Sequence, residues 1–374
     1  MNFRRTMRRL HLWLGLAAGS VVFVVALSGS VYVFEREIQD WLQGYRHVDA
    51  VPRPTQPPSR LRAIAEQQLA GETASRVYYE GPARAAYVQF GDMKSRYYKL
   101  VYVNPYDGRV LKVKDMNHDF FHLVFSLHYR LLLSPDVGTT IVDCATLVFV
   151  VILLSGLVNW FPRSWAVVRQ RLFIRWRAPW SRKNYDLHNV LGFHGFPVML
   201  VVALTGLVWG FAWFDDAVHW IVSGGAETQR YEQPASKGHS TSSTTQAENV
   251  DAAWARLASR YPNAETIIVF FPQTAEASIR YVVNPDRYTY YKTDHYYYDQ
   301  QSLAELEVSH DWGKYEDATR SAWVRRANFD IHIGAILGLP GKILAFVAGM
   351  IAASLPVTGF LIWWRKWTAS RRHP

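Results

Sequence analysis

The stretch that decides the fold is LHLWLGLAAGSVVFVVALSGSVYVF, Leu10–Phe34, which contains no charged residue. A helix needs about 20 predominantly apolar residues to cross the hydrocarbon core of a bilayer. Three further runs reach this length, namely Gly138–Trp160, Val190–Phe214 and Ile333–Trp364. The sequence therefore predicts four membrane-spanning helices. The mean hydropathy of -0.08 shows that the rest of the chain is polar.

The basic residues gather in three pieces, which are the N-terminal segment, the loop 161–187 and the tail 365–374. These pieces contain a single acid, Asp186, although the whole chain has 41 Lys and Arg against 31 Asp and Glu. Loops rich in Lys and Arg stay on the cytoplasmic side of a membrane. We expect a multi-pass membrane protein with both termini in the cytoplasm. Topology explains the positive charge, so nucleic-acid binding is not indicated.

Two long polar segments separate the spans, and each begins with a helical pattern followed by strand patterns rich in Tyr and Val. We predict two α+β domains on the non-cytoplasmic side and an internal duplication of a span, an outer domain and a returning span. The predicted parts are the N-terminus with the first helix (1–34), the first domain (35–137), the second helix (138–160), the basic cytoplasmic loop (161–187), the third helix (188–214), the second domain (215–330), the fourth helix (331–364) and the tail (365–374).

A Ser/Thr-Gly pair recurs once in each span. In the first and third spans, its hydroxyl residue follows a histidine by seventeen positions. Small residues let helix backbones approach closely in lipid, and this packing role is the one that the pairs predict. The pairs are Ser28-Gly29, Ser155-Gly156, Thr205-Gly206 and Thr358-Gly359.

The repeat also singles out four histidines. His11 and His188 begin spans at the cytoplasmic face, whereas His128 and His332 lie just before spans that start at the outer face. Ionisable side chains at a membrane span are costly and usually have a partner or a role. Facing imidazole pairs suit the axial ligation of an iron porphyrin, whereas zinc usually takes three or four protein ligands. The alternatives left open are His118 and His122 for His128, and His194 for His188.

Residue counts and motifs exclude other redox cofactors. The single cysteine, Cys144, excludes an intrachain disulfide, a four-cysteine iron–sulfur cluster and covalently attached haem. No glycine-rich dinucleotide motif lies between a strand and a helix, and the loop 161–187 is too short for a nucleotide-binding domain. An electron donor would therefore be a quinol or a separate reductase.

The residues around the four histidines resemble those of the PepSY-associated transmembrane family. The resemblance rests on Arg9–Gly15, Ser126–Leu132, Asp186–Gly192 and Ile331–Lys342, and it extends over almost the whole chain. The family includes iron-regulated inner-membrane proteins, FoxB-like proteins among them, some of which reduce ferric siderophores.

The resemblance implies an α-helical protein of the bacterial inner membrane, with a four-helix transmembrane bundle and two periplasmic PepSY-like α+β domains. It implies two b-type haems, one held by His11 and His188 and the other by His128 and His332. Electrons would then cross the membrane and reduce a ferric siderophore on the periplasmic side, so that iron is released.

Arg325 and Arg326 precede His332 in the sequence and could contact haem propionates or an anionic chelate. A membrane-proximal charge without a ligand explains them equally well. Two other functions also fit the chain. One is a non-enzymatic PepSY-type regulator or ligand-binding module, for which the histidines would be unnecessary. The other is a siderophore or haem permease, which the absence of a discontinuous helix pair disfavours.

Overall fold

The computed structural model describes residues 3–93, 97–162, 164, 168–236 and 245–372. Residues 163 and 165–167 of the predicted basic loop therefore lie outside the described residues. The chain divides into two compact units. The helical unit contains Met1–Glu35, Leu123–Val218 and Asp330–Pro374, and the sheet unit contains Arg36–His122 and His219–Phe329.

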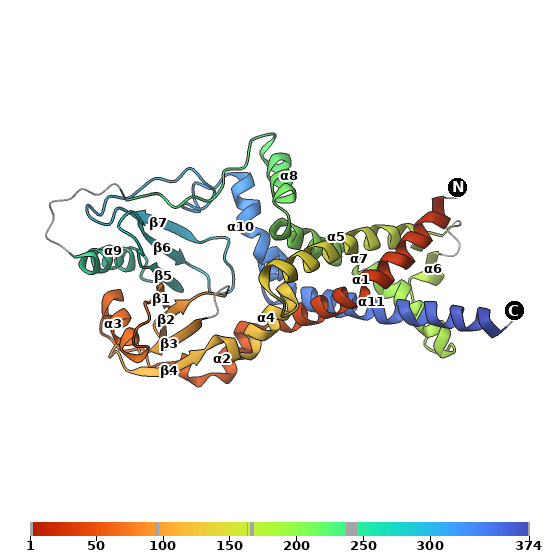
Figure 1. Cartoon of the computed structure of the whole chain (residues 1–374), viewed down its shortest axis with the longest axis horizontal. Coiled ribbons are helices and arrows are strands. Elements are labelled where there is room, and N and C mark those ends of the chain that lie inside the picture. Colours follow the sequence, from red (N-terminus) through yellow and green to blue (C-terminus); the bar gives the residue numbers. More distant parts are fainter. Residues whose placement is uncertain (1–2, 94–96, 163, 165–167, 237–244, 373–374) are drawn as a thin grey trace. The chain divides into compact units, whose positions relative to one another are not determined.

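Four long helices form the helical unit, and they are α1 (Phe3–Tyr32), α5 (Pro135–Trp160), α7 (Trp180–Gly210) and α11 (Gly338–Arg372). Each lies in a helical segment long and apolar enough to cross a membrane, which confirms the predicted number of spans. Both α1 and α7 pack against α5 and α11, so α1 and α7 face each other across the bundle. The two termini lie at the same end of this unit (Figure 1).

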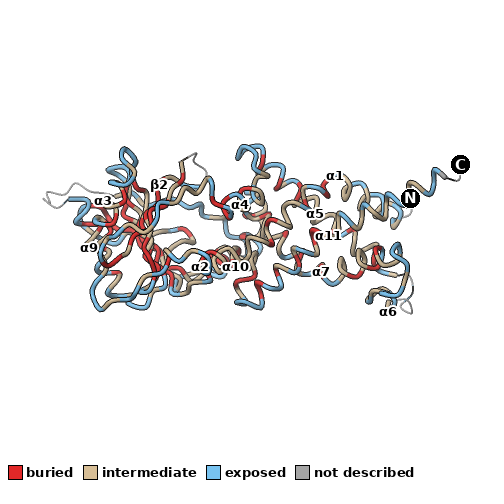
Figure 2. Tube along the Cα trace, turned by 90° about the horizontal axis from the view of Figure 1, so that it is seen from below, coloured by how far each residue is buried: buried red, intermediate tan, exposed pale blue. Residues whose placement is uncertain are grey.

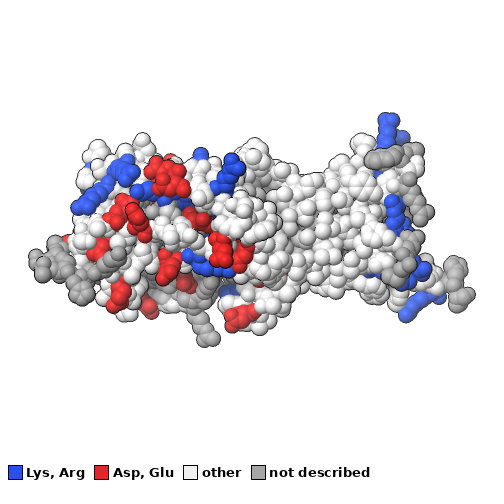
Figure 3. All heavy atoms as spheres, turned by 90° about the horizontal axis from the view of Figure 1, so that it is seen from above, with Lys and Arg blue, Asp and Glu red and all other residues white. Residues whose placement is uncertain are grey.

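The outer surface of the bundle is apolar, as contact with lipid requires. Large side chains such as Trp13, Val201 and Phe360 are exposed on it. Only 17% to 28% of the most apolar window of each span is buried inside the protein. On the face drawn in Figure 3, the sides of the bundle are almost free of charge, and Lys and Arg gather at the end that carries the termini. The protein is therefore a membrane protein.

The sheet unit is built on one seven-stranded antiparallel sheet in the order β4-β3-β2-β1-β5-β6-β7. Helices α3 (Pro58–Gln68) and α9 (Gln246–Arg260) pack against each other and share a buried apolar core with the sheet (Figure 2). The strands are β1 (Arg76–Tyr79), β2 (Ala86–Gly91), β3 (Tyr98–Val103), β4 (Val110–Asp115), β5 (Thr266–Phe270), β6 (Ile279–Asn284) and β7 (Asp294–Tyr298).

The shared sheet differs from the two separate domains that the sequence predicts. Each predicted domain contributes a helix followed by a meander of antiparallel strands, in agreement with the α+β prediction. However, β1 of the first segment pairs with β5 of the second, with Val77 opposite Val269. Alone, the first segment would expose unpaired backbone N–H and C=O groups along β1, and the second segment would expose those along β5. The pairing of β1 with β5 provides hydrogen-bond partners for these groups.

Shorter helices connect these elements, and two predicted spans begin elsewhere. Helix α7 starts at Trp180 rather than at 188, so His188 lies inside it. The predicted fourth span is interrupted, because α10 ends at His332 and Gly334 adopts a left-handed φ of 78° before α11 begins. The connecting helices are α2 (Glu35–Leu42), α4 (Phe120–Arg130), α6 (Val168–Arg171), α8 (Ala212–Ser223) and α10 (Arg320–His332).

An ion cluster around Asp40 joins the two segments of the sheet unit. Asp40 pairs with Arg46 and Arg84 of the first segment and with Arg287 of the second. Burial alone would raise the pKa of Asp40, but the hydrogen bond from Arg84 and the charges of Arg46 and Arg287 outweigh it and lower the pKa. The ionised carboxylate is thus bound more favourably in the folded state than in the unfolded chain.

This shift predicts a pH-dependent contribution to stability. The contribution is present above the pKa of an unfolded aspartate, about 4, and is lost as the pH falls through the lower folded value. Asp40→Asn should reduce the free energy of unfolding at neutral pH by about 2 kcal/mol and weaken the loss of stability on acidification. Thermal unfolding at a series of pH values tests this, with the exposed Asp49→Asn as control. Equal melting temperatures for Asp40→Asn and wild type at neutral pH would contradict it.

Candidate cofactor site

Four histidines form two facing pairs in the helical unit. His11 of α1 faces His188 of α7, and the two ring centroids are 6.2 Å apart. His128 of α4 faces His332 of α10 at the same separation of 6.2 Å. The structure therefore brings together the same two pairs that the sequence repeat predicts. All four side chains are half-buried.

The three alternative histidines have other partners. His122 lies in the sheet unit, where its ring packs edge-on against Tyr98 with 5.5 Å between centroids. His118 is exposed, and its Nδ1 atom lies 3.3 Å from the carboxylate of Asp115. His194 is also exposed, and its Nε2 atom lies 3.2 Å from the carbonyl oxygen of Leu172. These contacts favour His128 and His188 as the paired residues.

Each paired imidazole is bound through Nδ1 to an oxygen atom of another helix. A carbonyl oxygen can only accept a hydrogen bond, so Nδ1 of His11, His128 and His332 carries the hydrogen and Nε2 keeps its lone pair. The same assignment holds for His188, because the Thr358 hydroxyl donates its hydrogen to its own helix and the carbonyl of Leu355 also accepts from the ring. Metal-bound histidines are typically oriented by such a bond at the other ring nitrogen. The oxygens are Ile152 O for His11 (3.0 Å), Val25 O for His128 (2.8 Å), Val202 O for His332 (3.0 Å) and Thr358 Oγ1 for His188 (2.9 Å).

A glycine of a neighbouring helix lies against each ring. These four glycines belong to the Ser/Thr-Gly pairs. A Cβ atom added to any of them would meet Cε1 of the histidine. The sequence pattern predicts only close packing of helices, whereas the structure places a histidine ring at each glycine. The distances from that Cβ to Cε1 are 2.7 Å at Gly29 (His128), 3.0 Å at Gly156 (His11), 3.1 Å at Gly359 (His188) and 3.5 Å at Gly206 (His332).

Tight turns place His128 and His332 at the ends of short helices that precede a span. After α4, Leu131 and Leu132 adopt φ values of 54° and 59°. A Cβ at Gly138 would then lie 2.1 Å from the carbonyl oxygen of Arg130. After α10, a Cβ at Gly334 would lie 2.1 Å from the carbonyl oxygen of Gly341. Only glycine allows these approaches, so both turns depend on it.

The paired histidines fit the axial ligands of an iron porphyrin. With metal–nitrogen bonds of about 2 Å, each imidazole centroid lies about 3 Å from the metal, so two axial rings are about 6 Å apart. The observed 6.2 Å matches this separation, and the Nε2 lone pairs are available. Within the described part of the chain, no group of three or more His, Cys, Asp or Glu could hold a bare metal ion. The donor set therefore suits a macrocycle that supplies the other ligands.

Comparison with known protein families agrees with the motifs around these histidines. Residues 8–366 match the family model described as the PepSY-associated TM region. The chain belongs to this family. No curated protein is significantly similar to it in sequence. Membership of the PepSY-associated transmembrane family, which the motifs around the histidines predict, is thus confirmed.

The two arginines that the sequence predicts as possible haem-propionate contacts have partners in the sheet unit. Arg325 Nη1 lies 2.7 Å from a carboxylate oxygen of Asp311. Arg326 is only 2% exposed, and its Nη2 atom donates to the carbonyl oxygens of Thr293 and Gly313. Burial lowers the pKa of Arg326. A contact of either arginine with a haem propionate stays a prediction.

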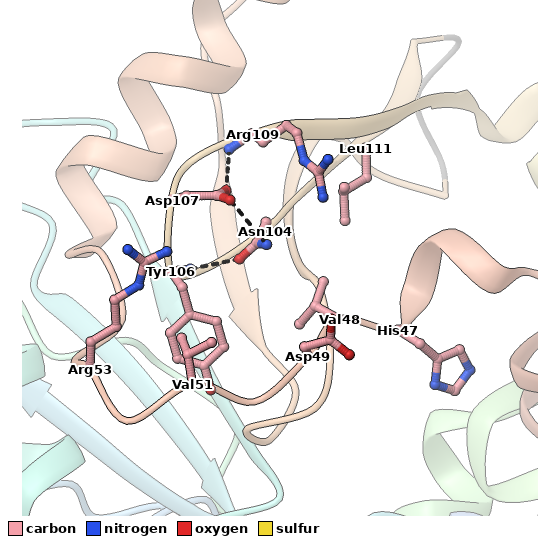
Figure 4. Close-up of a pocket in the computed structure, with 10 residues that line it drawn as sticks. All are labelled: His47, Val48, Asp49, Val51, Arg53, Asn104, Tyr106, Asp107, Arg109 and Leu111. Carbon is pink, nitrogen blue, oxygen red and sulfur yellow. Dashed lines mark hydrogen bonds between the residues drawn. The ribbon is translucent and has the colours of Figure 1, made fainter.

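The sheet unit also contains a surface cavity of about 440 Å³ beside the turn between β3 and β4 (Figure 4). The turn uses several of its polar groups itself. Asp107 accepts hydrogen bonds from the backbone nitrogen of Arg109 and from Asn104, which in turn accepts one from the backbone nitrogen of Tyr106. Exposed side chains such as Arg53 complete the lining, and none of the four paired histidines contributes to it.

The glycine contacts predict a position-specific effect on α1. Gly29→Ala should displace the ring of His128 and lower the free energy of unfolding by about 1–3 kcal/mol through overpacking. Gly15→Ala is a matched control on the same helix, because a Cβ there meets nothing within 4 Å. Thermal unfolding of both variants in detergent tests the difference. A loss of stability of equal size in Gly15→Ala would show that the helix, and not the ring contact, is responsible.

Proposed function

We propose that this PepSY-associated protein is an inner-membrane oxidoreductase that holds two b-type haems and reduces periplasmic ferric siderophores. The observation that supports it is the pair of facing imidazole couples, each with the spacing and the free Nε2 lone pair that axial ligation needs. When bound, the haems supply one-electron chemistry. Reduction would release iron, because Fe²⁺ binds hard oxygen ligands less tightly than Fe³⁺ does.

The protein residues have defined tasks in this proposal. His11 and His188 hold one haem, and His128 and His332 hold the other. A haem held by two histidines would supply electron transfer rather than oxygen chemistry. The bonds at Nδ1 orient each ring, so that the four imidazoles are held in place for a haem.

The two histidine pairs lie at different depths in the bundle. Helix α1 carries His11 and also Val25, which accepts the hydrogen bond of His128. Helix α7 carries His188 and also Val202, which accepts the hydrogen bond of His332. Fourteen residues separate the two positions on both helices. At about 1.5 Å per residue, this spacing corresponds to about 21 Å along the bundle. Electrons can therefore enter at one face and leave at the other.

The proposed orientation follows from charge. The basic residues of both terminal segments and of the loop 161–187 favour the cytoplasm. His11 and His188 then lie on the cytoplasmic side, where a quinol or a separate reductase supplies the electrons. His128 and His332 then lie on the periplasmic side, where the ferric siderophore would be reduced.

The first test of the proposal is the haem content of the purified protein. Wild type from haem-replete cells should contain two haems per chain, and His188→Ala and His332→Ala should each lose one. His194→Ala is the matched control on α7 and should keep both. Reduced-minus-oxidised absorption spectra with haem quantified per polypeptide provide the measurement. A colourless wild-type protein would instead favour a regulator or ligand-binding module.

The second test concerns the reaction. After chemical reduction of the haems in membrane vesicles, addition of a ferric hydroxamate chelate should reoxidise them and produce ferrous iron, which a chromogenic Fe²⁺ chelator detects. The variants that lose either haem should lower the rate at least about tenfold, since a tenfold change corresponds to 1.36 kcal/mol in the barrier. Uptake of the intact chelate without reoxidation would favour a permease.

A further inference from the structure

The hydroxyl groups of the Ser/Thr-Gly pairs can only accept hydrogen bonds from the histidines. Each hydroxyl is bonded to carbonyl oxygens of its own helix three or four residues earlier. Because a hydroxyl has one hydrogen, this bonding leaves only its oxygen lone pairs for a neighbour. The acceptors are Val24 O and Val25 O for Ser28, Ile152 O for Ser155, Val201 O and Val202 O for Thr205, and Ser354 O and Leu355 O for Thr358.

Three of these oxygens lie within hydrogen-bond distance of a histidine Nδ1. The distances are 3.2 Å from Ser155 to His11, 2.9 Å from Thr358 to His188 and 3.0 Å from Thr205 to His332. The fourth histidine is His128. Like His11 and His332, it bonds through Nδ1 to a carbonyl oxygen (Val25 O, 2.8 Å) to which the hydroxyl of the pair also donates. Among the described residues, however, its Nδ1 makes no hydrogen bond to the hydroxyl oxygen of Ser28.

The two pairs also differ in the angle between their rings. The planes of His11 and His188, which both have a hydroxyl contact, are 83° apart. The planes of His128 and His332, of which only His332 has a hydroxyl contact, are 56° apart. Oxygens at Nδ1 restrict rotation of a ring about the axis through Nε2. The pair with a hydroxyl contact on both rings is thus the one closer to perpendicular.

We propose that Ser155, Thr205 and Thr358 are positioning residues that set the rotation of the histidine rings and make the two haem sites electronically different. This inference rests on the proposed function. The angle between two axial imidazole planes governs the splitting of the iron d orbitals, and near-perpendicular rings give the more anisotropic ferric signal. A hydrogen bond from Nδ1 also makes the imidazole a stronger donor and so favours ferric iron.

Thr358 offers the sharpest test, because its helix carries a matched control. Thr358→Val replaces the hydroxyl by a methyl of similar size, and Thr358→Ser restores the oxygen. Ser354→Ala removes a hydroxyl one turn earlier on α11, where it bonds Ile351 O at 2.7 Å. The measurements are haem per polypeptide, electron paramagnetic resonance of the ferric protein, and the midpoint potential of each haem.

Wild type should show two low-spin ferric signals, one of them clearly more anisotropic. Thr358→Val should alter only the more anisotropic signal and raise the potential of that haem alone, and Thr358→Ser should reverse both changes. Thr205→Val should alter the other haem. Ser354→Ala should leave both haems unchanged. Loss of one haem in Thr358→Val, with recovery in Thr358→Ser, also supports a positioning role.

Failure of the inference and failure of the proposed function are distinguishable. Two haems with unchanged signals and potentials in both Thr358→Val and Thr205→Val would overturn the inference and leave the proposed function standing. Equal loss of haem in Thr358→Val and Ser354→Ala would overturn it too, since helix packing would then explain the effect. A wild-type protein without haem would overturn the proposed function itself.

Discussion

Each imidazole of the two pairs is bound by an oxygen atom of a helix other than the one that carries it, and the site depends on these four contacts. The contact determines which ring nitrogen carries the hydrogen, and the glycine beside it gives the ring its space. An imidazole on a single helix could rotate freely. Here, the bundle has to assemble before any ring is oriented, so imidazole orientation and helix packing are a single requirement.

Much of this arrangement is predictable from sequence, because length and spacing are local properties. The apolar runs identify the four spans, and the repeated spacing identifies His11, His128, His188 and His332. Hydropathy does not reveal the interruption after His332, since Gly334 and the residues that follow it are small or apolar and continue the run. The interruption depends on the close approach of the backbones at Gly334 and Gly341. Hydropathy averaged over a sequence window does not detect such a contact.

The role of the Ser/Thr-Gly pairs and the joining of the sheet show the other limit. Close helix packing is a sufficient explanation for a small residue in a span. The contact between each glycine and a histidine ring of another helix can therefore be recognised only in the three-dimensional structure. Similarly, the alternating pattern of β1 and β5 indicates strands but not which edges meet. The pairing of Val77 with Val269 joins residues far apart in the chain, and no local pattern records it.

Helices α1 and α7 each serve both histidine pairs, and this double use explains why the spacing is repeated. On α1, His11 contributes to one pair and Val25 to the support of the other, while His188 and Val202 have the same tasks on α7. Moving either helix along its axis would displace a paired histidine at one depth and a hydrogen-bond acceptor at the other. Inserting one residue between the two positions would rotate one of them by about 100° relative to the other, because a helix has about 3.6 residues per turn. That position would then no longer face the bundle interior. The separation in sequence is therefore constrained on both helices by the same geometry.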